Sequence, residues 1–338
     1  MKSTLIKVCS LLIIVVVFSA CGGNTSDTGS TVTHPAFQLP EVKAASALIR
    51  KDPKNARLYF ERGQLLVHLK QDTLALEDFK TAVSLDSTKS EYFSAIGDLM
   101  FEHKDIDGSI AWIEKAIKLN PRDPRARLKI AKMMIFLQDY TKAFAEINTV
   151  LRQNAMNPEG YFLKGIIYKE LKDTTKAISS FLTAVQVDPG YKDALLQLGN
   201  IHSYRKDPVA LQYYENAFRL DTTDVFPLYA KAMYYQDQGD FEKAKELYRQ
   251  SILYNSDYVN SFFNTGWILM QQDSLEKAWR QFDIVTKLEP TDAEAYYNRG
   301  LVSELMGKNQ EALADYKQAL IFAADYPEAK EGVRRLGN

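Results

Sequence analysis

The sequence predicts an all-α fold, an α-solenoid of antiparallel helix pairs with a short capping helix at each end. Three observations lead to this prediction. A pattern of apolar and small residues repeats with a period near 34 residues, two places in each unit hold small residues, and several units end at a proline, which cannot continue a helix. Each unit of such an array buries its apolar face against its neighbours, so 338 residues need no single large core.

Residues 158–191 show the unit most clearly. Two amphipathic segments lie on either side of a short polar turn, with Gly165 in the first and Ala177 in the second. The pattern returns 101 residues later as Gly266 and Ala278. Helix axes approach to about 8 Å only where the crossing residues lack bulk. These small residues therefore mark where the two helices of a unit touch.

Counted from Ala56, the chain divides into eight units, of which the fifth has 33 residues and the others 34. Their boundaries are 56–89, 90–123, 124–157, 158–191, 192–224, 225–258, 259–292 and 293–326. The small place in the first helix holds Gly63, Gly97, Ala131, Gly165, Gly199, Ala232, Gly266 and Gly300, and that in the second holds Ala75, Ser109, Ala143, Ala177, Ala210, Ala244, Ala278 and Ala312. Large residues that can fill the facing holes are Phe79, Phe181, Tyr214, Tyr248, Phe282 and Tyr316.

A period of 34 residues with these small and large places resembles the tetratricopeptide repeat. The resemblance covers about 270 residues. It implies a right-handed superhelix whose first helices line a concave surface, and in this family that surface takes peptides or partner helices. The resemblance also implies that the protein works by binding other proteins or peptides and is not an enzyme.

Two units depart from the pattern. The third has Val150 at a place that is usually small and Ala155 where a proline is expected. The fifth lacks one residue between its helices, where Lys206 is followed by Asp207 and Pro208. Asp207 can cap the second helix and Pro208 suits a first turn. We therefore expect the helix to survive, the turn to tighten and the superhelical pitch to change there.

Capping helices are predicted at both ends of the array. Residues 39–55 form an N-terminal capping helix, and residues 327–338 form a C-terminal one with charged residues on its outer side. The end units of a solenoid need a polar outer face to stay soluble. The sequence thus accounts for every residue from 39 onward by one array.

The N-terminus predicts export and anchoring. Residues 1–20 have basic Lys2 and Lys7 before an apolar run too short to span a bilayer, which is typical of a signal peptide. Phe18-Ser19-Ala20-Cys21 resembles the lipobox of bacterial lipoproteins, although Phe18 stands where Leu is usual. The resemblance implies lipidation of Cys21, and residues 21–38 would be a flexible linker. The alternative is a plain signal peptide with an incidental cysteine.

By analogy with lipoprotein sorting, Gly22 favours the outer membrane, with the protein facing the periplasm. The membrane partner would then be reached through the lipid at Cys21.

A candidate binding surface lies on the first helices of the last three units. We call it the apolar strip, and its residues are Phe226, Tyr229, Met233, Phe263, Asn264, Trp267, Met270, Tyr297, Asn298 and Leu301. Aromatic residues and Met are enriched in interface cores, and the two Asn side chains could hydrogen-bond a bound backbone. The alternative is that tight superhelical winding buries the strip as core. In the first five units the same places are more mixed.

Several function classes find no support. The formal net charge is −1, and removal of the predicted signal peptide leaves 40 basic and 43 acidic residues, so a nucleic-acid partner is not expected. Cys9 and Cys21 are the only cysteines, the four histidines are far apart, and no phosphate-binding glycine loop is present. We expect no catalytic residue, no metal and no cofactor. The Lys and Asn pattern of a carboxylate-binding repeat is also missing.

Three functions fit these observations. The first is a membrane-anchored protein–protein interaction scaffold in cell-envelope assembly or secretion. The alternatives are a periplasmic chaperone-like adaptor, and a recruiter or regulator of a peptidoglycan or proteolytic enzyme. The sequence leaves self-association into a homo-oligomer open, because the terminal repeats of such arrays are exposed.

Overall fold

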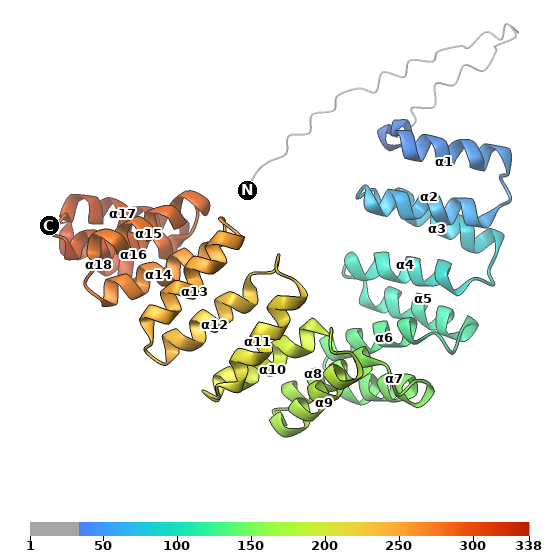
Figure 1. Ribbon diagram of the computed structural model, residues 1–338. Coiled ribbons are helices and arrows are strands. Elements are labelled where there is room, and N and C mark those ends of the chain that lie inside the picture. The colour runs from blue at the N-terminus through green and yellow to red at the C-terminus, as the bar shows by residue number, and fades with distance from the viewer. Residues whose placement is uncertain (1–33, 338) are drawn as a thin grey trace, which may run out of the picture.

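The computed structural model describes residues 34–337, and this range is all helical, with eighteen α-helices, one 3-10 helix and no strand. The helices stack in chain order along one open arch, with α1 at one end and α18 at the other (Figure 1). The all-α solenoid predicted from the sequence is therefore confirmed. The predicted signal peptide, Cys21 and most of the predicted linker lie outside the described residues.

Each predicted unit holds one helix pair. The pairs are α2 (Ala56–His68) with α3 (Asp72–Leu85), α4 (Ser90–Glu102) with α5 (Ile106–Leu119), α6 (Pro124–Phe136) with α7 (Tyr140–Gln153), α8 (Pro158–Glu170) with α9 (Thr174–Val187), α10 (Lys192–Tyr204) with α11 (Val209–Leu220), α12 (Phe226–Asp237) with α13 (Phe241–Tyr254), α14 (Val259–Gln271) with α15 (Leu275–Leu288), and α16 (Ala293–Leu305) with α17 (Asn309–Phe322). Seven first helices begin at the first residue of their unit, and α12 begins at the second.

The turn inside every unit is built in the same way. Its fifteenth residue has a positive φ, between 54° and 76°, and these residues are Lys70, Lys104, Gln138, Lys172, Lys206, Gly239, Asp273 and Gly307. In unit 4 the N–H of the next residue, Asp173, donates to the carbonyl of Tyr168 at 2.9 Å, which closes the first helix. The Asp173 carboxylate then accepts the N–H of Lys176 at 3.1 Å and caps the second helix. One short turn thus ends one helix and starts the next.

The small places of the first helices lie against the large residues of the second. A Cβ at Gly63 would lie 2.5 Å from the ring of Phe79, and a Cβ at Gly199 would lie 2.6 Å from the ring of Tyr214. Phe79 and Tyr214 are each 2% exposed. Real Cβ atoms do not tolerate such distances, so glycine allows the close approach that fills the core.

The fifth unit differs at its shortened turn. Helix α11 has 12 residues, whereas the other second helices have 14. The Asp207 carboxylate accepts the N–H of Val209 at 3.0 Å, as expected of a cap. Pro208, however, precedes α11 and does not lie in its first turn. The expected change in superhelical pitch stays a prediction.

The ends are closed by α1 (Pro40–Lys51) and α18 (Pro327–Leu336). Residues assigned to the flexible linker are already folded before α1, because Pro35–Gln38 form the 3-10 helix η1, with Ala36 buried and Phe37 packed on the first core cluster. Two features explain why helical structure begins before α1. Pro35 suits a first helical turn, and the ring of His34 accepts the N–H of Ala36 at 3.3 Å.

Candidate partner-binding surface

The apolar strip lies on α12, α14 and α16, the first helices of units 6 to 8. Phe226 and Met233 are 36% and 39% exposed, Asn298 is 8% exposed, and the other seven residues are partly buried. The strip is therefore neither a fully open groove nor a closed core. One side of most of its residues packs on the array, and the other side reaches solvent.

The aromatic rings of the strip pack on rings of the second helices. Ring centroids lie 5.7 Å apart for Tyr229 and Tyr248, 5.4 Å apart for Phe263 and Phe282, and 5.6 Å apart for Tyr297 and Tyr316. The last residue of units 6 and 8 adds a further ring. The ring centroid of Tyr258 lies 5.4 Å from that of Tyr229, and the ring centroid of Tyr326 lies 5.0 Å from that of Tyr297. Such tilted and edge contacts fix the orientation of the rings. The strip thus presents a preorganised surface.

The two asparagines are bound within the fold. The Asn264 amide donates to the hydroxyls of Tyr229 at 3.1 Å and Tyr248 at 3.0 Å. The Asn298 amide donates to the carbonyl of Glu294 at 2.8 Å. Asn264 therefore has only its carbonyl oxygen to offer a partner, and both amides hold the strip in place. Their binding of a partner backbone stays a prediction.

The strip carries no charged side chain, and its phenols stay neutral. Burial raises the pKa of Tyr229 and of Tyr297 above the usual value of 10, and it also raises the pKa of the neighbouring Tyr326 to about 12. A neutral apolar surface of this kind suits an apolar partner segment.

Trp267 is the most distinctive residue of the strip. Its ring lies edge-on to Phe241, with centroids 6.2 Å apart, and packs beside the cores of units 6 and 7. Its indole N–H makes no hydrogen bond within residues 34–337, whereas the indole of Trp279 donates to the Ser303 hydroxyl at 3.0 Å. Trp267 can therefore offer a partner both an apolar ring and a hydrogen-bond donor.

The first helices of units 2 to 4 present a different surface. Lys129 on α6 pairs with Asp98 on α4 at 2.6 Å, and Lys132 on α6 pairs with Glu159 on α8 at 2.6 Å. These ion pairs connect successive units and are partly exposed. Each of these two lysines is thus paired with a carboxylate of a neighbouring unit.

Two hollows lie away from the strip. One, of about 610 Å³, is lined by residues of units 1 and 2, including Arg57, Phe60 and Tyr92. The other, of about 820 Å³, lies between α5, α6 and α7 and combines apolar Ile117 and Ile130 with a charged rim. The sequence analysis predicted neither hollow, and the isoleucines of the second have a helical spacing that is equally typical of core.

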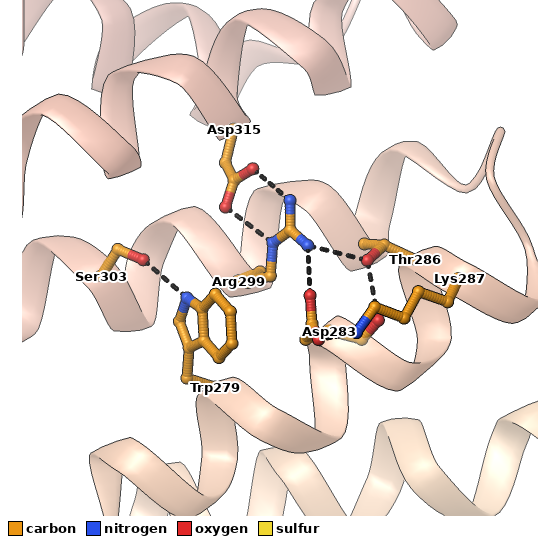
Figure 2. Close-up of polar contacts among 7 residues, drawn as sticks. All are labelled: Trp279, Asp283, Thr286, Lys287, Arg299, Ser303 and Asp315. Atoms are coloured by element: carbon orange, nitrogen blue, oxygen red, sulfur yellow. Dashed lines mark hydrogen bonds and ion pairs between the residues drawn. The ribbon is translucent and has the colours of Figure 1, made fainter.

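A largely buried arginine on α16 was also missed. The guanidinium of Arg299 donates to both oxygens of Asp315, at 2.9 and 2.6 Å, and to Asp283 at 2.7 Å and Thr286 at 2.9 Å (Figure 2). It also lies 5.6 Å from the ring centre of Trp279. We call these residues the Arg299 cluster. It joins α15, α16 and α17, and the side chains of its three ionised residues are at most 17% exposed.

The first unit has a related cluster at the same places. Arg62 donates to both oxygens of Asp78, at 2.7 and 2.6 Å, and to the hydroxyl of Ser46 on α1 at 2.9 Å. Units 2 to 7 lack an arginine at this place. Alignment of the eight units would have shown the paired Arg and Asp, so the signal was present in the sequence.

The described range contains neither a membrane helix nor a metal cluster. None of its helices combines the length and apolar character that a membrane crossing needs. Residues 34–337 also hold no group of three or more His, Cys, Asp or Glu side chains placed to bind a metal ion.

Comparison with known proteins agrees with this architecture. Two family models described as tetratricopeptide repeat match residues 42–90, 229–279 and 276–329, and residues 158–191, which together make up more than half of the chain. A TPR repeat-containing protein of Methanocaldococcus jannaschii is 23% identical over 301 residues, covering 79% of this chain and 50% of that protein. The chain spans about half the length, or less, of curated relatives of this kind.

Solved structures are similar in fold. The C-terminal part of a TPR repeat-containing protein from Cytophaga hutchinsonii has a TM-score of 0.56 and 19% identity, covering 70% of this chain and 98% of that one. PilW, a type IV pilus biogenesis factor, has a TM-score of 0.51 and 20% identity, covering 62% of this chain and 97% of its own. This chain therefore belongs to the tetratricopeptide repeat proteins, which are protein-interaction scaffolds.

Proposed function

We propose that this protein is a membrane-anchored scaffold that binds an apolar segment of a partner protein on the strip of units 6 to 8. The observation that carries the proposal is the strip itself, a neutral surface of oriented rings in which Phe226 and Met233 are exposed. Exposed apolar patches on a folded protein mark interaction sites. Ring contacts and the Asn264 amide hold this surface ready before the partner arrives, which lowers the entropic cost of binding.

The occupant is a partner segment with aromatic or aliphatic anchors and few charges. Such anchors can pack between the rings of successive units, and the free N–H of Trp267 can take a backbone carbonyl of the segment. The strip offers no charge for an acidic or basic peptide to pair with. Catalysis by this chain itself is not part of the proposal.

The test uses the two exposed residues, which carry little of the core. Full-length Met233→Glu and Phe226→Asp proteins are compared with wild type in quantitative pull-downs from membrane fractions. Leu253→Glu is the matched control, because Leu253 is 70% exposed but lies on α13, outside the strip. A charge at the centre of an apolar contact costs about 2 kcal/mol or more, so partner recovery should fall roughly thirtyfold.

Recovery that is unchanged in both strip variants, with melting temperatures equal to wild type, would contradict the proposal. An equal loss in Leu253→Glu would show that the effect is not specific to the strip. Recovery of many unrelated segments, in place of a defined set of proteins, would instead favour the chaperone-like adaptor.

The anchor and its location complete the proposal. Lipidation of Cys21 would hold the protein at the outer membrane, facing the periplasm, where it would serve envelope assembly or secretion. Similarity in fold to PilW, a type IV pilus biogenesis factor, supports a process of this kind. Mass spectrometry of the native protein should show a diacylglyceryl group on Cys21. Recovery in the inner-membrane fraction after density separation would overturn the location.

A further inference from the structure

Helix α1, at the N-terminal end of the array, has a buried inner side and an outer side that exposes both apolar and charged residues. Its inner side places Val42, Ser46 and Ile49 against the array, and all three are buried. Its outer side exposes Leu48, at 50%, and the preceding Leu39 is 38% exposed. Exposed residues Pro40, Ala44 and Leu48 are spaced by four and therefore share one side of the helix. No part of the described chain covers this outer face.

The opposite end of the array is built differently. The outer residues of α18 are charged, and several are paired, as in Lys330 with Asp325 and Arg335 with Glu304. A polar outer face is what a terminal helix needs to remain in water. The outer face of α1 instead mixes apolar Ala44 and Leu48 with charged Glu41 and Lys51, and no other part of residues 34–337 covers it.

The charges around α1 indicate which kind of surface this face suits. Lys43, Arg50 and Lys51 are exposed, and none of them forms an ion pair within residues 34–337. Glu41 is the single acidic residue of the helix. A helix face that combines apolar side chains with free cations is the pattern of helices that lie on an anionic lipid surface.

The position of α1 in the chain fits the same surface. Helix α1 begins 19 residues after Cys21, so an extended chain would keep it within about 65 Å of that residue. Every other α-helix is farther along the chain, and α18 lies at the far end of the arch (Figure 1). A membrane that holds Cys21 is therefore brought to this end of the array.

We infer that the outer face of α1 lies on an anionic lipid surface, with Leu39 and Leu48 in the interface and Lys43, Arg50 and Lys51 at lipid phosphates. The inference rests on the proposed anchor only for bringing the membrane to this end. It goes beyond that anchor, because it fixes which end of the scaffold touches the membrane.

The test places a polarity-sensitive dye on α1. The full chain carries Cys9→Ser, Cys21→Ser and Leu48→Cys, so that it holds no lipid and one label. It is mixed with phosphatidylcholine vesicles, with or without phosphatidylglycerol. A matched control carries the label at Ile321→Cys, which is 71% exposed in the last unit. We expect a blue shift and quenching by brominated lipid at position 48 with the anionic vesicles, and neither at position 321.

Charge reversal tests the phosphate contacts. Lys43→Glu, Arg50→Glu and Lys51→Glu together should weaken vesicle binding at position 48 by about tenfold or more, since each basic residue near an anionic surface contributes to binding. The control reverses three exposed cations elsewhere, Lys277, Arg280 and Lys317. It should leave the signal at position 48 unchanged.

Two results would overturn the inference. The first is a label at position 48 that stays in water when anionic vesicles are present. A blue shift without vesicles that grows with protein concentration would show that a second copy covers α1. Native protein without a diacylglyceryl group would remove the proposed anchor but would not alter the vesicle result, because the tested chains have serine at position 21.

Discussion

The first helices of units 2 to 4 and of units 6 to 8 occupy the same places in one repeating frame, but their exposed surfaces differ. In the first region Lys129 pairs with Asp98 and Lys132 with Glu159, so the charges satisfy one another across units. In the second, Tyr229 and Tyr297 pack on rings beneath them and expose apolar surface. The residues packed between the two helices of a unit determine the repeating backbone. The exposed positions on the first helices can therefore vary from unit to unit. One array therefore carries an ion-paired surface and an apolar surface.

The largest expected effect comes from Arg299, the largely buried cation between α15, α16 and α17. Arg299→Leu leaves Asp315 without a cation and Asp283 with only the exposed Lys287, and breaking a largely buried pair in this way costs about 3–5 kcal/mol. Because units of a solenoid depend on their neighbours, units 7 and 8 should open first. Hydrogen exchange of α15 to α17 and urea unfolding measure the effect.

Arg62→Leu sharpens the same comparison. It leaves one carboxylate, Asp78, and one hydroxyl, Ser46, without the guanidinium. We expect a loss smaller than that of Arg299→Leu. A surface control, Arg249→Leu, removes an exposed pair with Glu246 and should cost less than about 1 kcal/mol. Equal losses in all three variants would contradict the distinction between buried and exposed pairs.

A smaller effect is expected from the hydroxyl beneath the strip. Tyr248→Phe removes the group that accepts from Asn264 and donates to Gln236 at 2.8 Å, which should cost about 1–2 kcal/mol. Partner affinity should fall as well, because Asn264 would no longer be fixed from both sides. The control is Tyr214→Phe in unit 5, whose hydroxyl bonds Asn200 and Ser203 and lies outside the strip. Its stability loss should be comparable, and its partner binding should equal that of wild type.

Low pH should destabilise helix α18 at the C-terminal end of the array and leave the strip folded. Hydrogen bonds from Arg335 and Tyr316 hold the pKa of Glu304 below its usual value of 4.5. Because the folded-state pKa is lowered, the stability it contributes is present above about pH 4.5 and is lost as pH falls through the folded-state pKa. Exchange of α18 should therefore rise below that pH. Glu304→Gln should weaken α18 at pH 7 and remove this acid dependence, and an unchanged dependence would contradict the assignment.

The smallest effect is expected in the charged region. Lys129→Ala and Lys132→Ala each remove a partly exposed pair and should cost between 0 and about 1 kcal/mol, less at high salt. Partner binding should not change. Loss of the partner in either variant would move the binding surface to units 2 to 4 and end the distinction between the two regions.

Most of the frame could be predicted from the sequence because its signals are local and repeated. Gly63 and Phe79, or Gly199 and Tyr214, are matched by size within one unit, and the structure brings them together as expected. The repeat pattern did not predict the structure of the residues that precede α1. Residues 35–38 were assigned to a linker, because the cap from His34 and the packing of Phe37 are not visible in composition.

The sequence predicted where the candidate site lies but not how far its residues are buried. The spacing of the ten residues placed them on one side of three helices. It did not decide whether that side is an exposed groove or part of the buried core. The structure shows a half-buried surface between these readings, because rings such as Phe263 pack on the second helices with one side only. The engagement of Asn264 by two tyrosines from different helices joins residues 35 and 16 positions away, which no local pattern reveals.

By itself, the sequence determined the helix pairs, their length, the turns and the close contacts within each unit, because steric fit and helix capping act over one period of 34 residues. Only the tertiary structure decided which polar groups meet across units. It placed Arg299 against two carboxylates from neighbouring helices, paired Lys129 with Asp98, and left the outer face of α1 uncovered. The physical reason is that burial and ion pairing depend on how successive units are rotated against one another, and no single unit holds that information.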